Sequence, residues 1–195
     1  MQRSIGMKFY FLCATLLWAS SAQASFHLYD IREIYSNGDG SIQFVELFTA
    51  NNGQQFLDGH TVVASQSAST NTFTFVGSGP SPTGNRPLLL ATSGFAAACG
   101  ITPDYILADN FLFDPNGSVE FGPDADTVAY TSLPLDGVTS LNFPGGTTGT
   151  NSPENFAGAS CSLTAPPVPS LGPWGLIALG MIGATILVQR ARYPI

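Results

Sequence analysis

Short apolar runs separated by hairpin dipeptides constrain this chain more than any other feature of its sequence. Gly and Asn accept the positive φ angles that tight turns between strands require. Runs such as HTVVASQ, PLLLAT and DTVAYTSL are rich in β-branched or apolar residues and too short for ordinary helices. The spacing therefore predicts an all-β fold, an antiparallel β-sandwich. The turn signals are Asn37-Gly38, Asp39-Gly40, Asn52-Gly53, Asp58-Gly59, Gly84-Asn85, Asn116-Gly117 and Asp136-Gly137.

The stretch YSNGDGSIQFVE, residues 35–46, fits either a hairpin or a calcium loop. On the EF-hand pattern, Asp39 and Glu46 fall at ligand positions, but Tyr35 stands at the first position, where a carboxylate is required. The flanking residues alternate at strand period, whereas an EF-hand needs a helix on each side. We expect a hairpin, and the alternative is a calcium site that Asp39 forms with another loop.

The charges are distributed unevenly. All 13 acidic residues lie between Asp30 and Glu154, against 2 basic ones, so this body carries a net charge near −11. Such a charge repels phosphate backbones and excludes nucleic acid as a partner. It either keeps a secreted domain soluble or attracts divalent cations. Four of the six basic residues lie near the chain ends, at Arg3, Lys8, Arg190 and Arg192.

Residues 1–24 have the pattern of a secretory signal peptide. Two basic residues and the apolar run FYFLCATLLWA are followed by Ala22 and Ala24, which form a small-residue cleavage site before Ser25. The pattern predicts export through the inner membrane and removal of this segment by signal peptidase.

Residues 171–188 form an uncharged apolar run, which meets the requirement of about 20 residues for crossing a bilayer. Arg190 and Arg192 follow it, and the positive-inside rule places the C-terminus in the cytoplasm and the acidic body outside. A buried core helix is the alternative, but the run is apolar on all faces. Residues 161–170 are rich in proline and predict a linker.

The C-terminal residues resemble the IPTL-CTERM protein-sorting tail, a relative of the PEP-CTERM tail of Gram-negative bacteria. The resemblance implies recognition by an exosortase-type sorting protease at the membrane. The family pattern is a short box, a Trp-Gly pair, an apolar helix and an arginine cluster. The matching residues are Val168, Pro169, Ser170, Leu171, Trp174, Gly175, Arg190 and Arg192.

The body, over about residues 28–130, resembles the lamin-tail domain family. The resemblance is carried by Ile31-Arg32-Glu33-Ile34, by Phe44-Val45-Glu46-Leu47-Phe48 and by Phe56-Leu57-Asp58-Gly59, with His60 where the family usually has Trp. It implies an immunoglobulin-like sandwich. Members of the family act mostly as binding or scaffold modules of surface proteins.

Two cysteines, Cys99 and Cys161, remain after removal of the signal segment that contains Cys13. An oxidising compartment favours a disulfide between them, and two separate thiols are the alternative. Cys99 lies in SGFAAACG, which is too rich in alanine for a strand. We expect a helical turn that begins after Ser93 and ends at Gly100.

No catalytic motif stands out: the chain has no nucleophile elbow, no metal-spaced His or Cys pair and no phosphate loop. Two carboxylates on facing strands would form a glycosidase pair, for which Glu46 and Glu120 are the candidates. Asp114, Asp124 and Asp126 lie in the densest acidic loops. They are either solvated turn residues or the ligands of a cation.

The sequence thus predicts an exported structural or binding protein of a Gram-negative cell envelope, and not an enzyme. It would lie in the periplasm, at the surface or outside the cell, and its expected partners are the membrane, signal peptidase and the sorting protease. No cofactor is expected. The alternatives are a secreted hydrolase acting on polysaccharide and a calcium-stabilised adhesin-like module. The expected parts are 1–24 (signal peptide), 25–160 (ectodomain), 161–170 (linker) and 171–195 (sorting and transmembrane segment).

Overall fold

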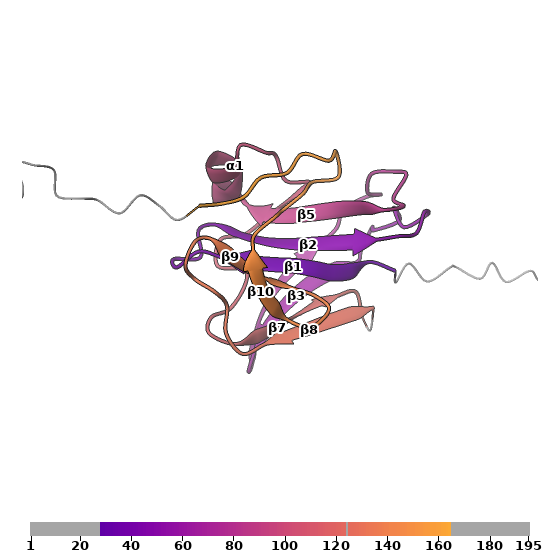
Figure 1. The fold of residues 1–195 in the computed structure, drawn as a ribbon. Helices are drawn as coiled ribbons and strands as arrows, with labels where there is room; N and C mark the ends of the chain where they lie inside the picture. Colours follow the sequence, from indigo (N-terminus) through magenta and orange to yellow (C-terminus); the bar gives the residue numbers. More distant parts are fainter. Residues whose placement is uncertain (1–27, 124, 165–195) are drawn as a thin grey trace, which may run out of the picture.

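Two β-sheets pack face to face in the computed structural model, which describes residues 28–123 and 125–164 (Figure 1). The expected all-β sandwich is confirmed. Sheet A contains, in spatial order, β10 (Thr147–Thr150), β9 (Thr139–Asn142), β1 (Asp30–Ser36), β2 (Gln43–Thr49), β5 (Arg86–Thr92) and β6 (Tyr105–Leu107). Sheet B contains β4 (Ser69–Thr74), β3 (Thr61–Gln66), β7 (Gly117–Phe121) and β8 (Asp126–Tyr130).

The stretch at residues 35–46 is the hairpin between β1 and β2. The Asn37 N–H donates to the carbonyl of Ile42 at 2.9 Å and closes the turn. Gly40 has φ +70° and lies against the Asn110 side chain, so the turn requires glycine here. The Asp39 carboxylate accepts hydrogen bonds from the N–H and hydroxyl of Ser41 at 3.0 and 2.6 Å. Strands on both sides exclude an EF-hand.

β1 contains a bulge that strict alternation did not predict. Its register against β2 shifts between Ile31 and Glu33, so Arg32 is the extra residue. The shift lets both Ile31 and Ile34, three positions apart, face the core between the sheets. Leu28, which precedes the strand, is 48% exposed and takes no part in that core.

Sheet A is buried on both faces, which divides the core in two. Val45 and Leu47 of β2 face sheet B and join the main core with Val119 and Phe121. Phe44 points the other way into a second cluster. That cluster also contains Tyr35, Leu89, Ala91, Phe95 and Leu163.

Helix α1 (Ser93–Cys99) covers part of this outer face, as Figure 1 shows. It follows β5 directly and ends at Gly100, whose φ of +73° is the left-handed conformation that caps helices. The helical turn expected from SGFAAACG is confirmed. Beyond it, β6 runs parallel to β5. Sheet A is therefore mixed, whereas the sequence predicted a wholly antiparallel sandwich. A crossover connection through a helix is the usual way to join parallel neighbours.

The folded body continues past residue 160, where the sequence placed the start of a linker. Cys161 is bonded to Cys99, and Leu163 is buried in the second cluster. The signal segment, its cleavage site, the sorting residues and the apolar run at 171–188 lie outside the described residues. Within the described residues, no helix has the length and apolar character needed to span a bilayer.

Truncation of Phe44 tests whether the outer cluster carries stability. Phe44 is fully buried and stacks against Tyr35 at 5.3 Å between ring centroids. We expect Phe44→Ala to lower the free energy of unfolding by about 3–5 kcal/mol, because the cavity adds to the lost transfer energy. Urea denaturation measures this loss, with Val76→Ala, at a side chain 86% exposed, as the control. A loss below about 1 kcal/mol would contradict the role given to this cluster.

Candidate functional site

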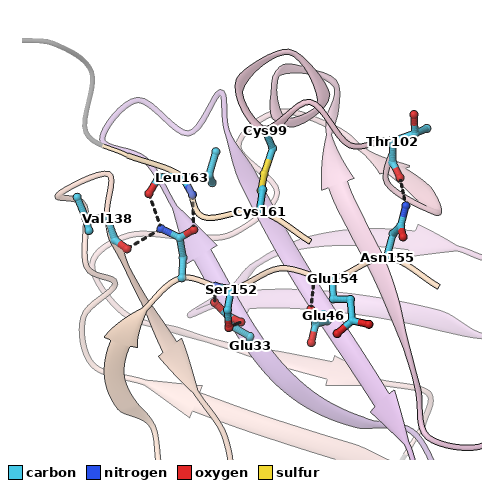
Figure 2. Close-up of a disulfide and its surroundings, with 11 residues drawn as sticks. Glu33, Glu46, Cys99, Thr102, Val138, Ser152, Glu154, Asn155, Cys161 and Leu163 are labelled. Carbon is cyan, nitrogen blue, oxygen red and sulfur yellow. Dashed lines mark hydrogen bonds between the residues drawn. A yellow bond between two sulfur atoms is a disulfide. The ribbon is translucent and has the colours of Figure 1, made fainter. Parts of the chain in front are cut away.

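The C-terminal residues 151–163, here called the strap, cross the outer face of sheet A beside α1. Figure 2 shows this segment with the side chains that fasten it. Its bonds to residues as distant as Glu33 join the two ends of the folded body. Two regions are described below, the strap and a lateral hollow beside β8.

Two buried carboxylates of neighbouring strands hold the strap by its backbone. Glu33 of β1 accepts hydrogen bonds from the N–H and hydroxyl of Ser152 at 2.9 and 3.1 Å. Glu46 of β2 accepts a hydrogen bond from the N–H of Glu154 at 2.7 Å (Figure 2). The strap is not a strand of sheet A, so its N–H groups need acceptors, and these carboxylates supply them.

Two asparagines fasten the strap, Asn151 at its start and Asn155 within it. The Asn151 amide donates to the carbonyls of Val138 and Leu163 at 2.5 and 3.0 Å, and its oxygen accepts from the Leu163 N–H at 2.6 Å. Asn155 donates to the carbonyl of Thr102 at 3.0 Å. The strap thereby closes on itself and on the segment that follows α1.

Asp104 is a third carboxylate that bonds backbone groups of both the sheet and the strap. It accepts hydrogen bonds from the N–H groups of Leu89 and Phe156 at 2.8 and 2.9 Å. Burial raises the pKa of the Asp104 carboxyl, while these two bonds oppose the rise. The strap is therefore attached to β5 as well as to β1 and β2.

The structure joins Cys99, the last residue of α1, to Cys161 of the strap in a disulfide (Figure 2). The two Cα atoms are 5.9 Å apart, within the range that disulfides adopt. This is the pair that the sequence favoured. The bond ties the helix and the strap together over the outer cluster.

Glu46 is the most perturbed carboxyl of the described chain. Its side chain is 0% exposed, and burial raises its pKa to about 7, although the Glu154 N–H and Arg32 favour the charged form. The Nε of Arg32 lies 2.5 Å from the carboxylate. The Arg32 side chain is 36% exposed, so water weakens its attraction to Glu46, and desolvation of Glu46 dominates.

The candidate glycosidase pair of Glu46 and Glu120 does not form in the structure. Glu46 alternates with Val45 and Leu47, which face the main core, and so lies on the outer face of sheet A. Glu120 alternates with Val119 and Phe121 of that core and lies on the outer face of sheet B. The whole sandwich separates the two carboxylates, so they cannot act on one substrate.

A hollow of about 650 Å³ opens between β8, the start of β1 and the turn that joins β9 to β10. This volume is within the usual range of small-molecule sites. Apolar side chains line it together with three charged ones, Asp30, Arg32 and Asp126. The lining comprises Asp30, Ile31, Arg32, Phe48, Asp126, Thr127, Val128, Ala129, Phe143, Pro144, Gly145 and Gly146.

Some polar groups of the hollow already bond to other parts of the protein. Asp126 accepts a hydrogen bond from the N–H of Ile31 at 2.6 Å and links the two sheets. Arg32 lies over the Phe48 ring at 5.0 Å while it pairs with Glu46. Burial raises the pKa of Asp30, and the neighbouring charge of Asp126 adds to that effect. The hollow presents aromatic and carboxylate surface to a ligand, and no histidine or cysteine lines it.

The two described candidate cation ligands, Asp114 and Asp126, line different hollows and are not brought together. Asp126 bonds to Ile31, and Asp124 lies outside the described residues. Asp114 lines a second, smaller hollow of about 330 Å³ that Asp39 also lines, and the carboxylate of Asp39 is already bonded to Ser41. The described chain contains no group of three or more His, Cys, Asp or Glu side chains that could hold a metal ion.

Comparison with known proteins returned no match: no family model, no curated protein and no solved structure is similar to this chain.

Sequence reasoning missed the strap and the buried roles of Glu33, Glu46 and Asp104. One signal was present, since NSPENFAGASCSL combines Asn, Ser and Pro with only a few apolar residues and reads as a loop. Nothing in that composition shows that a sheet face lies beneath it. Acidic residues inside the otherwise apolar runs DIREIYS and QFVELFT were the clue to outward carboxylates that need partners.

Replacement of Glu46 tests its effect on stability against pH. A carboxyl whose pKa rises on folding binds its proton more tightly in the folded state, so stability falls as pH rises from the unfolded value toward about 7. We expect the wild type to lose about 2–3 kcal/mol between pH 5 and pH 8 from this group. Glu46→Gln should flatten that slope in urea denaturation. Glu154→Gln, at a side chain 38% exposed, is the control and should keep it.

Removal of the disulfide tests the attachment of the strap. The bridge spans a sequence separation of 62 residues, and the entropy model assigns such a loop about 4 kcal/mol. We expect the Cys99→Ser/Cys161→Ser double variant to lose stability by about this amount, measured by urea denaturation. Two free thiols in the native exported protein would contradict the bridge itself.

Proposed function

We propose that this chain is an exported structural or binding protein, held or sorted at a Gram-negative cell envelope, without catalysis of its own. The observation that supports it best is the use of its acidic residues. Of the 12 acidic residues that the structure describes, seven accept hydrogen bonds from backbone N–H groups. These seven are Glu33, Asp39, Glu46, Asp58, Asp104, Asp126 and Asp136.

Carboxylates bonded in this way stabilise loops and are poorly placed to exchange protons with a substrate. The strap depends on Glu33, Glu46 and Asp104, while Asp136 accepts from the N–H groups of Val138 and Thr139 at 2.8 and 2.7 Å. These bonds hold the pKa of Asp136 below its ordinary value. Acids placed this way support a scaffold role over an acid–base role.

Export is supported by the disulfide and by the signal pattern. Disulfides persist in oxidising compartments and are rare in the cytosol of mesophiles. The Cys99–Cys161 bond lies immediately before the proline-rich residues and the apolar run. A disulfide at this point would transmit mechanical force on the C-terminal tail to α1 as well as to the strap.

The immunoglobulin-like assignment and the sorting tail belong to the same proposal. The lamin-tail resemblance gives the body a binding or scaffold role, and the IPTL-CTERM resemblance gives the tail an exosortase-type partner. The hollow beside β8 is the candidate ligand site of the body, because its aromatic and charged lining suits a ligand with both apolar and polar groups.

A secreted hydrolase is the second candidate, since Asp30 and Asp126 both line the hollow and interact electrostatically. The Asp126 carboxylate is already bonded to the Ile31 N–H, so among the described residues that line the hollow Asp30 is the carboxylate without a structural hydrogen bond. This favours binding over hydrolysis. A calcium-stabilised adhesin is supported less, because no set of ligands converges in the described chain.

Intact mass of the protein recovered from the envelope and from the medium tests the proposal. We expect a mature chain that begins at Ser25, about 2 Da lighter than its reduced form because of the disulfide. A mass that ends near residue 168 would show that the tail is processed, and a mass that runs to Ile195 would show a lasting anchor. A chain that retains residues 1–24 in the cytoplasmic fraction would contradict export.

A further inference from the structure

We propose that the free edge of β4 pairs with the same edge of a second copy of this chain, which joins two sandwiches through one continuous sheet. The inference goes beyond the proposed function, since neither export nor ligand binding requires a dimer. It rests on the backbone of β4 and on the residues that flank it in sheet B.

β4 is an outermost strand of sheet B, so one of its edges faces no other strand of the described chain. The N–H of Phe75 donates to the carbonyl of His60 at 2.9 Å and sets the phase of the ladder between β3 and β4. The direction of N–H and C=O groups alternates along a strand. Thr70, Thr72 and Thr74 therefore direct their main-chain groups away from β3.

Nothing in the described chain occupies these groups. The three threonines are exposed, and none of their main-chain groups has a hydrogen bond to another described segment. β4 keeps a regular register with β3 over all six of its residues. It also contains no proline, glycine or charged residue. Natural edge strands are usually protected by a charge, a proline, a bulge or a covering segment. β4 has no charge, proline or bulge. The Asn71 amide donates to the carbonyls of Asn110 and Phe111 at 3.0 and 2.9 Å. Asn71 alternates with the three threonines, so it holds that segment on the core-facing side of β4.

The other three edges offer less to a partner strand. β6 has only three residues, and β10 has four, one of them Gly149, which weakens strands. At the free edge of β8, only Thr127 and Ala129 direct their main-chain N–H and C=O groups outward. The hydrogen bond from the Gly122 N–H to the carbonyl of Thr61 fixes which residues of β7 face β3, and the register between β7 and β8 then fixes which residues of β8 face β7. β4 is therefore the longest open edge.

A second copy fits this edge because the strand is complementary to itself. Antiparallel pairing about a two-fold axis at Thr72 places Thr72 opposite its own copy and Thr70 opposite Thr74. Each of these three pairs can exchange two N–H···O bonds, and facing threonines are favourable cross-strand neighbours. The edge of β4 is uncharged, so pairing does not set carboxylate against carboxylate in this acidic protein.

The net charge of the whole chain opposes association at long range. The full sequence carries −7 at pH 7 and its acidic body, with 13 acidic and 2 basic residues, carries near −11, so exported copies repel each other and salt screens this repulsion. We therefore expect association to strengthen as salt concentration rises, the opposite of a dimer held by ion pairs. This trend separates edge pairing from an electrostatic contact.

Sedimentation equilibrium of the protein purified after export tests the proposal. In about 0.5 M NaCl, where the screening length is about 4 Å, the wild type should show twice the monomer mass at about 100 µM. Thr72→Pro should weaken association at least about tenfold, because the lost N–H points toward the partner and not toward β3. Thr72→Val keeps this N–H and the strand propensity and should remain dimeric. Thr72→Lys adds facing positive charges at the axis and should also be monomeric.

A cross-link locates the contact. A short bismaleimide should join two copies of Thr72→Cys and should fail to join copies of Thr127→Cys on the edge of β8. A wild type that stays monomeric under these conditions would overturn the proposal. So would a folded Thr72→Pro or Thr72→Lys variant that dimerises as the wild type does, or cross-linking through Thr127→Cys alone.

Discussion

Burial of the outer face of sheet A is the constraint on which the rest of the structure depends. Phe44, Leu89 and Tyr35 project from that face and must be shielded from water, as the inner face is by sheet B. A two-sheet sandwich provides no second layer there. The chain provides one with α1 and the strap, and the disulfide joins these two elements to each other.

This second cover creates an electrostatic problem that the acidic residues solve. An irregular segment that packs over a sheet removes some of its backbone N–H groups from water, and each of these needs a hydrogen-bond acceptor. Glu33, Glu46 and Asp104 provide acceptors from the strands and the loop beneath. These carboxylates lose hydration in turn. The pKa of Glu46 rises to about 7 because its desolvation has a larger effect than its bonds to the Glu154 N–H and Arg32. The perturbed carboxyl is thus explained by the architecture and needs no catalytic role.

The bulge in β1 links the strap to the lateral hollow. The extra residue there is Arg32, which reaches Glu46 on the outer face and lies over Phe48 at the rim of the hollow. A change at the hollow that moves Arg32 would alter the charge balance around Glu46. The two regions are therefore physically connected through one side chain.

The sequence by itself determined the β class, the first hairpin, the helical turn at SGFAAACG and the preferred partner of Cys99. Each of these follows from local rules: turn dipeptides, the periodicity of apolar residues, a C-terminal glycine and the small number of cysteines. Only the tertiary structure decided that β6 is parallel, that Arg32 is a bulge, that Glu46 and Glu120 lie on opposite faces, and that residues 151–163 are a cover rather than the approach to a linker. These features depend on which surfaces meet after folding, and contacts between residues such as Glu33 and Ser152, far apart in the chain, leave no periodic signal in a single sequence.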